Sequence, residues 1–306
     1  MSKKLRIGTR ESQLAVWQAQ LVKSLLHQQG VDSELVLIKS EGDIDLTTPL
    51  YAMGVQGIFT RSLDLALLTG QIDLAVHSMK DVPIQLPAGL TEAAILERGS
   101  PLDLFLPHSE NHLTNLDEHM QGTIATSSLR RKAQWLYRFP EDQIEPIRGN
   151  VNTRLKKLEA SQWQGAIFAA AGLQRIGLRP ENAIELNWMI PAPAQGAILV
   201  VCNEKDHHVK AHCEKLNDRQ TAFCVKIERD FLSALLGGCS TPIGALAEIA
   251  DEEVFFRGNI LDTEGKKMYS VEKRLSIDLA ASVGISAAHE LISKGANELL
   301  QKKQHA

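Results

Sequence analysis

The stretch LRIGTRESQLAVWQAQLVKSLLHQQG, residues 5–30, predicts a short β-strand followed by an amphipathic α-helix. We expect the strand over residues 5–7, and Ser12 is placed to cap a helix that Gly30 ends. The apolar residues of this helix recur at spacings of three and four, which puts them on one face: Leu14, Trp17, Leu21 and Leu25. One strand–helix unit therefore opens the chain.

The alternation of strands and helices continues through the first third of the chain. Residues 33–39 read as a strand, residues 58–68 as a helix that Gly70 stops, and residues 73–78, DLAVHS, as a buried strand. This order predicts an α/β fold with a largely parallel sheet. Ligands bind beyond the carboxyl ends of strands in such sheets, so the residues that follow Ile7 and Val76 are site candidates: Arg10, Ser12, Ser78, Lys80 and Asp81.

A second α/β series is expected after residues 97–107, ERGSPLDLFLP, which read as a linker. Its strands are expected over 123–126, 144–147 and 166–169, with helices from Ser127 or Ser128, over about 151–160, and near Leu173. Pro191 and Pro193 mark a crossing into a strand over 197–202 that could return to the first domain. Two such crossings would make a hinged cleft.

The last part of the chain predicts a small α+β domain. Residues 219–236 read as a helix, Gly237 and Gly238 break it, and two or three strands precede a helix from about Ser276. The predicted fold class is thus α/β, with two α/β domains around a hinged cleft and a small C-terminal α+β domain. The expected domains are residues 1–97 with 197–215, residues 102–192, and residues 218–306.

Composition places the 306 residues among ordinary globular proteins, with 44% hydrophobic and 23% charged residues. The start, MSKKLRIG, lacks the apolar run of a signal peptide. The most apolar stretches, GAIFAAAGL at 165–173 and GAILVVC at 196–202, fall far short of the roughly 20 residues that span a bilayer. We expect a cytoplasmic protein that does not interact with a membrane, with its four cysteines as reduced thiols.

Positive charge gathers in residues 122–180, which hold ten Lys or Arg against four Asp or Glu although the whole chain carries −4. Within it, TSSLRRKAQW at 126–135 places hydroxyl and N–H groups at a helix start, directly before two guanidinium groups, a pattern that binds anions. Several arginines could clamp acidic groups bidentately: Arg130, Arg131, Arg148, Arg154 and Arg175. The pattern indicates an anionic ligand, and a solvated basic face is the alternative.

Other classes of site find less support. His208 and His212 have helical spacing and Cys213 is adjacent, but HExxH and CxxC patterns are absent, so we expect no metal. No phosphate-binding glycine loop is present. A nucleic-acid binder is a weak alternative, because the basic segment lacks interleaved aromatic residues and the whole chain is acidic.

Cys239 lies in LLGGCSTPIG, a glycine-rich loop that follows a predicted helix. A thiol in such a loop suits covalent attachment or nucleophilic attack better than Cys213 or Cys224, which fall inside helical patterns. A buried structural cysteine is the alternative.

Seven motifs along the chain carry a family resemblance. They are TRESQLAVWQA at 9–19, VHSMKDVP at 76–83, TSSLRR at 126–131, RGNVNTRL at 148–155, AGLQRIGL at 171–178, PAPAQGA at 191–197 and GGCSTPIG at 237–244. In order and spacing they resemble the porphobilinogen deaminase family over nearly the whole chain. The resemblance implies three domains, the first two arranged like a periplasmic binding protein.

The resemblance also implies an activity. It implies a transferase of porphyrin and heme biosynthesis, which condenses four porphobilinogen molecules head to tail into hydroxymethylbilane with release of ammonia. A dipyrromethane cofactor, joined to Cys239 by a thioether, would prime the growing polypyrrole. Asp81 is implied as the catalytic carboxylate, which would accept hydrogen bonds from pyrrole N–H groups and stabilise the positive charge that develops as ammonia leaves.

Binding residues follow from the same resemblance, motif by motif. It assigns to the cofactor Ser78, Lys80, Asp81, Thr126, Ser127, Ser128, Arg130, Arg131, Arg148 and Gly149. It assigns to the substrate and the growing chain Arg10, Ser12, Phe59, Arg148, Arg154, Arg175 and Gln195. We expect a monomer, with uroporphyrinogen III synthase as a downstream partner and no nucleic acid.

The chain departs from the family pattern at a few positions. In YAMGVQGIF, residues 51–59, the lysines that the family usually carries are absent at Ala52 and Gln56. Asn152 and Ala194 stand where the family usually has glycine. A non-catalytic binding protein or sensor for an acidic small molecule, on the same hinged fold, remains the rival hypothesis.

Overall fold

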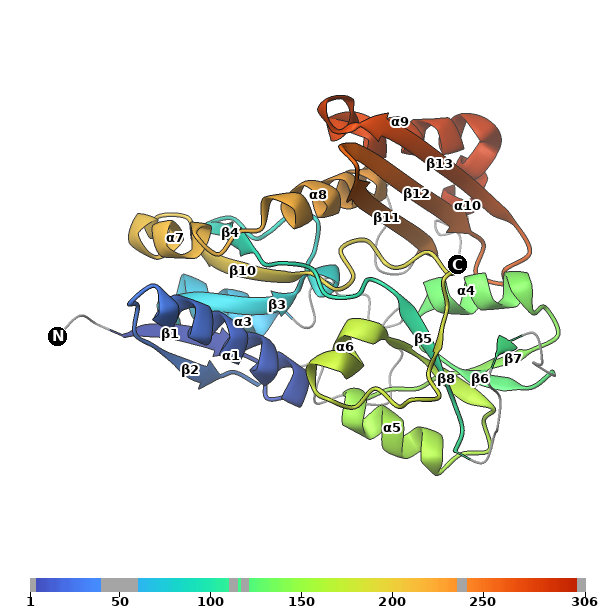
Figure 1. Cartoon of the computed structure of the whole chain (residues 1–306), viewed down its shortest axis with the longest axis horizontal. Helices are drawn as coiled ribbons and strands as arrows, with labels where there is room; N and C mark the ends of the chain where they lie inside the picture. The colour runs from blue at the N-terminus through green and yellow to red at the C-terminus, as the bar shows by residue number, and fades with distance from the viewer. Residues whose placement is uncertain (1–3, 40–59, 110–114, 117–120, 236–240, 302–306) are drawn as a thin grey trace.

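A computed structural model describes residues 4–39, 60–109, 115–116, 121–235 and 241–301, and three β-sheets organise them (Figure 1). Phe59, Cys239 and the positions of the missing lysines, Ala52 and Gln56, lie outside the described residues.

The first sheet has the strand order β2-β1-β3-β10-β4. Its strands are β1 (Leu5–Thr9), β2 (Ser33–Leu37), β3 (Leu74–Ser78), β4 (Leu90–Ile95) and β10 (Ile198–Asn203). β1 pairs in parallel with β2 and β3, whereas β10 runs antiparallel to β3 and β4. The helices associated with this sheet are α1 (Gln13–Gln28), α3 (Arg61–Leu68) and α7 (His207–Glu214).

Alternation along β3 explains how this sheet is covered on both faces. Leu74 and Val76 belong to the hydrophobic cluster that α1 completes, while Ala75 belongs to the cluster that α3 completes. Successive side chains of a strand point to opposite faces, so an apolar run such as LAVHS needs a helix on each side.

The second sheet has the order β7-β6-β8-β5-β9 and repeats the same pattern. Its strands are β5 (Asp103–Pro107), β6 (Thr123–Ala125), β7 (Gln143–Glu145), β8 (Gly165–Ala169) and β9 (Ile184–Glu185). β6 is parallel to β7 and β8, and β5 is antiparallel to β8 and β9. The associated helices are α4 (Leu129–Arg138), α5 (Val151–Glu159) and α6 (Ala170–Arg175).

The expected linker over 97–107 is wrong in its second half, because residues 103–107 form β5. Every residue of this strand is buried, with Leu104 and Leu106 in one hydrophobic cluster and Phe105 in another. A strand that is covered on both faces lacks alternation, and a proline before the strand and another at its end made the segment read as a break. The first sheet also contains β4, which the sequence analysis did not anticipate.

The chain passes between the two sheets twice. It leaves β4 through residues 96–102 to enter β5, and it returns through residues 186–197 to enter β10. In both sheets the strand that follows a crossing is the antiparallel one beside three parallel strands. This exchange of strands confirms the expected pair of α/β domains joined by two crossing segments.

The third sheet is antiparallel and consists of β11 (Ile243–Ala250), β12 (Glu253–Leu261) and β13 (Met268–Ser276). It packs against α8 (Arg219–Ala234) and α9 (Val283–Leu291), and the Phe231 and Phe256 rings lie 5.2 Å apart in this core. The chain ends in a π-helical turn (Ile292–Ala296) and α10 (Asn297–Gln301). The small C-terminal α+β domain is thereby confirmed.

The C-terminal helix begins later than the sequence analysis expected. Residues Ile277–Ser282 form a 3-10 helix, and α9 starts only at Val283. None of the helices within the described ranges is long and apolar enough to cross a membrane.

Candidate functional site

The carboxyl ends of two parallel strands place the first candidate residues. β1 ends at Thr9 directly before Arg10, and its neighbour β3 ends at Ser78. A 3-10 turn, Met79–Asp81, follows β3 and carries Lys80 and Asp81. Parallel strands end at the same edge of a sheet, so these side chains share the edge at which ligands bind in α/β proteins. The Ser78 hydroxyl also accepts a hydrogen bond from the Gln18 Nε2 at 2.9 Å.

The serines at the helix starts have partners within the protein. The Ser12 hydroxyl caps α1 by accepting from the Ala15 N–H at 3.3 Å, and Ser128 caps α4 by accepting from the Arg131 N–H at 3.4 Å. The Ser127 hydroxyl donates to the Ile147 carbonyl at 2.9 Å. The Thr126 hydroxyl accepts from the Ser128 N–H at 3.2 Å. Ser12 thus shapes the start of α1, and Thr126, Ser127 and Ser128 shape the start of α4.

Arg130 and Arg131 share a carboxylate that the sequence analysis missed, that of Asp103. Both arginines are 6% exposed and Asp103 is 0% exposed. Arg130 Nη1 donates to Asp103 Oδ2 at 2.8 Å, and Arg131 Nη2 donates to Oδ1 at 2.7 Å. Burial by itself raises the pKa of Asp103, but the two guanidinium groups outweigh burial and hold it below its ordinary value. The one signal in the sequence was an acidic residue opening the apolar run DLFLP.

Gln195 connects this group to the first sheet. Its side chain is 1% exposed. Nε2 donates to Asp103 Oδ1 at 2.9 Å, and Oε1 accepts from the Lys80 ammonium at 3.1 Å. The pKa of Lys80 is lowered to about 8, chiefly by burial and then by Arg131, while Asp81 and Asp103 act to raise it. The second crossing segment thus joins an ammonium of one α/β domain to a carboxylate of the other.

The start of α5 brings further arginines to the same place. Gly149 has φ +114, and a Cβ there would lie 2.6 Å from Thr153 Cγ2, so glycine is required at this turn. Its carbonyl accepts from Arg154 Nε at 2.7 Å. Burial first, and then Arg131, lower the pKa of Arg154 to about 10, while Asp81 raises it. The positive charges of Arg148, which is buried, and of Arg10 also act to lower the pKa of Arg154.

Arg175 lies where the two α/β domains meet. Its Nη2 donates to the Gly196 carbonyl at 2.6 Å, and its guanidinium carbon lies 5.6 Å from the centre of the Trp17 ring in α1. Burial lowers the pKa of Arg175 to about 10. Asn152 of α5 makes a second link between the domains, since its Nδ2 donates to Gln13 Oε1 at 2.8 Å. The structure therefore gives Arg175 a part in joining the domains.

Together these residues form what we call the cationic cluster: Arg10, Lys80, Arg130, Arg131, Arg148 and Arg154, with Asp81 and Asp103. Arg130, Arg131 and Arg148 are each less than 10% exposed, so they do not belong to a solvated basic face. Arg130 Nε is buried and finds no hydrogen-bond partner among the residues that the structure describes. Six cations against two carboxylates, with an unsatisfied donor, suit a ligand that carries several carboxylates.

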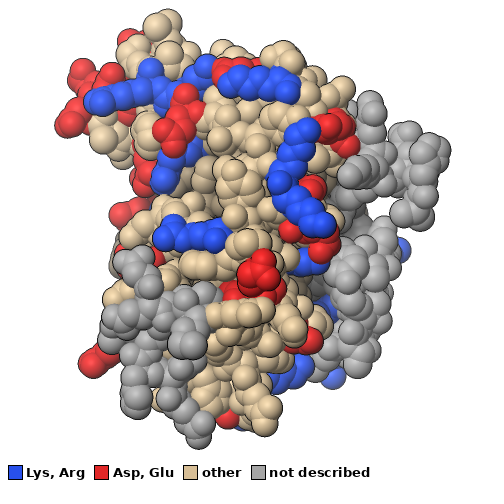
Figure 2. All heavy atoms as spheres, turned by 90° about the vertical axis from the view of Figure 1, so that its right-hand side faces the viewer, with Lys and Arg blue, Asp and Glu red and all other residues tan. Residues whose placement is uncertain are grey.

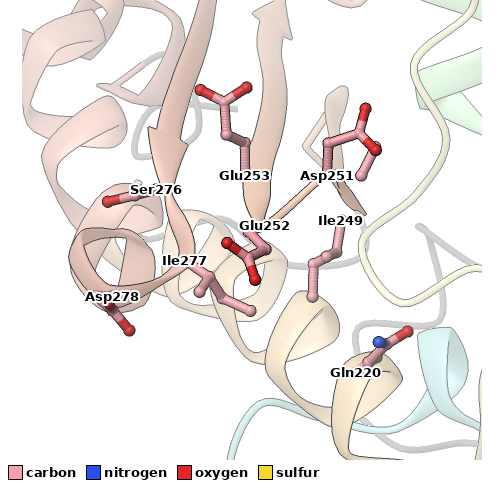
Figure 3. A pocket seen from close by; sticks show the side chains of 9 residues that line it. Gln220, Ile249, Asp251, Glu252, Glu253, Ser276, Ile277 and Asp278 are labelled. Atoms are coloured by element: carbon pink, nitrogen blue, oxygen red, sulfur yellow. The ribbon is translucent and has the colours of Figure 1, made fainter.

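The outer surface shows no comparable surplus on the face seen in Figure 2, where Lys and Arg side chains are interspersed with Asp and Glu. A surface hollow lies in the C-terminal domain, between the turns at the ends of β11 and β13 (Figure 3). Its lining includes four acidic residues, Asp251, Glu252, Glu253 and Asp278, and no member of the cationic cluster. Such a lining repels carboxylates, so this hollow is not the candidate site.

The alternative metal and thiol sites have weak support. His208 and His212 face each other on α7 with their Nε2 atoms 3.4 Å apart, but no group of three or more metal ligands occurs within the described ranges. Cys202, Cys213 and Cys224 are buried, and burial raises their thiol pKa values to about 11, about 12 and about 12. These three thiols are therefore poor nucleophiles at neutral pH.

The strand that follows Cys239, β11, is connected to the cationic cluster through the second crossing segment. α8 ends at Ala234, and β11 begins at Ile243. The Ala245 N–H donates to the Pro191 carbonyl at 3.0 Å, and the adjacent Ile190 carbonyl accepts from Arg130 Nη1 at 3.0 Å. The strand that follows the loop is thus attached to the same crossing segment that Arg130 contacts.

Comparison with known families gives two matches that cover most of the chain. A family model described as porphobilinogen deaminase, dipyromethane cofactor binding domain, matches residues 5–211. A second, described as porphobilinogen deaminase, C-terminal domain, matches residues 222–293.

Similar solved structures share little sequence with this chain. The Bordetella pertussis BvgS periplasmic VFT2 domain is 11% identical, with 69% of this chain and 86% of that chain covered and a TM-score of 0.43. The L-cystine solute receptor of Neisseria gonorrhoeae is 13% identical, with 70% and 85% covered and a TM-score of 0.38. An amino acid ABC transporter substrate-binding protein of Streptococcus pneumoniae is 12% identical, with 70% and 86% covered and a TM-score of 0.39. At these values the likenesses say nothing about a ligand.

Proposed function

Since this chain belongs to the porphobilinogen deaminase family, we propose that it condenses four porphobilinogen molecules head to tail into hydroxymethylbilane, with release of ammonia. Family membership makes the protein a transferase with a dipyrromethane cofactor, and it places porphobilinogen as the substrate. The observation that carries the proposal is the cationic cluster around Asp81, formed where the two α/β domains meet.

The residues of the cluster fit the cofactor because each of its pyrroles bears an acetate and a propionate. Lys80, Arg130, Arg131 and Arg148 would hold these carboxylates, and the unsatisfied Arg130 Nε would gain a partner. The start of α4 would present N–H and hydroxyl groups from Thr126, Ser127 and Ser128 to the cofactor. We assign Ser78 and Gly149 to the cofactor as well. When bound, the dipyrromethane supplies the pyrrole carbon from which the chain grows. We assign its thioether attachment to Cys239.

Asp81 is the carboxylate that we assign to catalysis. It is half-buried and makes no hydrogen bond or ion pair of its own among the described residues, while Lys80 and Arg154 lie close enough to interact with it. A carboxylate without a protein partner is available to pyrrole N–H groups and to the positive charge that develops as ammonia leaves the substrate.

We assign binding of the substrate and of the growing polypyrrole to a second set of residues: Arg10, Ser12, Phe59, Arg148, Arg154, Arg175 and Gln195. Ser12, Arg175 and Gln195 also hydrogen-bond within the protein, so their contribution includes holding α1 and the second crossing segment in place. The monomeric state, the cytoplasmic location, the domain boundaries and the downstream partner stay predictions.

The rival hypothesis, a non-catalytic binding protein, needs the same hinged fold but no covalent cofactor. Intact mass separates the two, because the deaminase should exceed its sequence mass by two condensed pyrroles. We expect Cys239→Ser to lose both this excess and hydroxymethylbilane formation, while Cys224→Ser keeps both. A wild-type protein without the mass excess after incubation with porphobilinogen, or a Cys239→Ser variant that retains it, would overturn the assignment.

A further inference from the structure

Asp103 is an interior carboxylate to which the reaction as outlined assigns no role. It opens β5, it is 0% exposed, and its two oxygens accept four hydrogen bonds. Oδ2 accepts from Arg130 Nη1 at 2.8 Å, and Oδ1 accepts from Arg131 Nη2 at 2.7 Å and Arg131 Nε at 3.1 Å. Gln195 Nε2 completes the set at 2.9 Å from Oδ1. The carboxylate thus holds the Arg131 guanidinium through two nitrogens and the Arg130 guanidinium through one.

The link continues to Lys80. Gln195 has one donor group and one acceptor, and the structure uses both, toward Asp103 and toward the Lys80 ammonium at 3.1 Å. Gln195 Nε2 also donates to the Pro101 carbonyl at 2.7 Å, which ties the second crossing segment to the first. Lys80 is thereby held at a set place relative to the two arginines, although it belongs to the other α/β domain.

Charge shows why a carboxylate is needed here. Lys80, Arg130 and Arg131 are three cations, and like charges in a buried place repel strongly. The groups that act on Lys80 come from three elements: Asp81 on the turn after β3, Asp103 on β5, and the two arginines on α4. Both carboxylates favour the protonated ammonium, and both arginines oppose it.

We propose that Asp103 is a positioning residue of the cofactor site, which holds the two guanidinium groups and, through Gln195, the Lys80 ammonium in one array for the carboxylates of the dipyrromethane. The proposal rests on the proposed function for the identity of the ligand. The array itself rests on the contacts of Asp103.

The first test measures Lys80 directly. Acetylation by acetic anhydride requires the neutral amine, so labelling of Lys80 as a function of pH, followed by peptide mass spectrometry, gives its titration midpoint without any catalytic step. Asp103→Asn keeps the shape and removes the charge, so the midpoint should fall by roughly one pH unit or more, because a nearby opposite charge shifts a pKa by 1–3 units. Asp103→Glu should bring the midpoint back toward that of the wild type.

The matched control is Asp142→Asn. Asp142 is a second buried aspartate of the same domain, which accepts from the Trp135 indole N–H at 2.7 Å and from the Gly122 N–H at 2.9 Å. Its loss should perturb the domain without moving the Lys80 midpoint. An unchanged midpoint in Asp103→Asn, or an equal shift in Asp142→Asn, overturns the proposal.

The second test measures how fast the protein acquires the cofactor. Cofactor-free protein is incubated with porphobilinogen, and the fraction that gains the mass of two pyrroles is followed with time. We expect Asp103→Asn to gain it at least tenfold more slowly than Asp142→Asn, and equal rates would count against the proposal. A wild-type protein that never gains the mass refutes the proposed function, whereas the Lys80 titration still decides on Asp103. If Asp103→Asn does not fold, Gln195→Met leaves both arginine pairs intact and should lower the Lys80 midpoint, and an unchanged midpoint again overturns the proposal.

Discussion

Asp81 and Asp103 show how two carboxylates of one cluster come to serve different purposes. Asp103 is enclosed and accepts from two arginines and a glutamine, so its charge is already committed to the protein. Asp81 sits on a short turn at the end of β3, half-buried, with no hydrogen bond of its own among the described residues. A group that must interact with charge as it develops is useful only if it is not already paired, which favours Asp81 as the catalytic residue.

This difference predicts the effect of removing the charge of Asp81. Asp81→Asn keeps the shape and should lower turnover by a factor on the order of 10² to 10³, because an electrostatic contribution of that size is lost. Asp81→Glu should cost less. Steady-state kinetics of hydroxymethylbilane formation provides the measurement. Asp278→Asn removes a carboxylate from the remote hollow of Figure 3 and should leave turnover unchanged. Near wild-type turnover in Asp81→Asn would refute the role.

Among the elements, the second crossing segment contains a residue in a strained backbone conformation. Ala194, in the second crossing, has φ +61, a conformation that costs a residue with a Cβ roughly 1–2 kcal/mol. Its N–H donates to Glu228 Oε2 at 2.6 Å, which holds the backbone there. The family usually has glycine at this position, and the positive φ gives the physical reason.

Replacing Ala194 by glycine tests that strain. Ala197 lies in the same segment, is buried like Ala194, and has no positive φ, so it serves as the matched control. Ala197→Gly should lose about 1 kcal/mol of unfolding free energy through added backbone entropy. Ala194→Gly relieves strain that offsets this entropy, so it should be neutral or stabilising by up to about 1 kcal/mol. Urea unfolding measures the unfolding free energy of both variants. Equal losses of unfolding free energy would show that Ala194 is not strained.

At the scale of the whole molecule, one buried carboxylate connects the three sheets. Glu228 of α8 is 0% exposed and accepts from Arg98 Nη1 at 2.6 Å in the first crossing segment. It also accepts from the Ala194 N–H at 2.6 Å in the second crossing and from the Ala247 N–H at 2.9 Å in β11. The next residue, Arg229, donates to the three carbonyls that follow Asp81, those of Val82, Pro83 and Ile84. The C-terminal domain therefore supports both crossing segments and the chain that follows Asp81.

Removing the charge of Glu228 should therefore destabilise the whole protein. Glu228→Gln leaves Arg98 without its counter-charge, and breaking a buried pair in this way costs about 3–5 kcal/mol. Asp230→Asn, on the same helix, breaks the exposed pair with Lys226 and should cost about 1 kcal/mol or less. Thermal unfolding measures both. If Glu228→Gln is no less stable than Asp230→Asn, the Arg98–Glu228 pair does not stabilise the crossing segments.

The sequence alone determined the fold class, most of the helices and strands, and the family. Local periodicity predicted α1, β3 and α5 because each buries a face through residues that are neighbours along the chain. Arg130, Arg131 and Asp81 could be named as site candidates because a helix start and a strand end are local features as well. The family followed from seven motifs in order, which need no contacts to be seen.

Only the tertiary structure decided which groups meet. Asp103 lies 28 residues before Arg131 along the chain and 92 before Gln195, in a segment that read as a linker, and no local pattern relates such positions. The same holds for Arg175 against Gly196 and for Glu228 against Arg98. A guanidinium group looks the same in a sequence whether it faces a ligand or a buried carboxylate. Folding settles the difference, because burial of an ionised group requires a partner and the packing of distant strands supplies it.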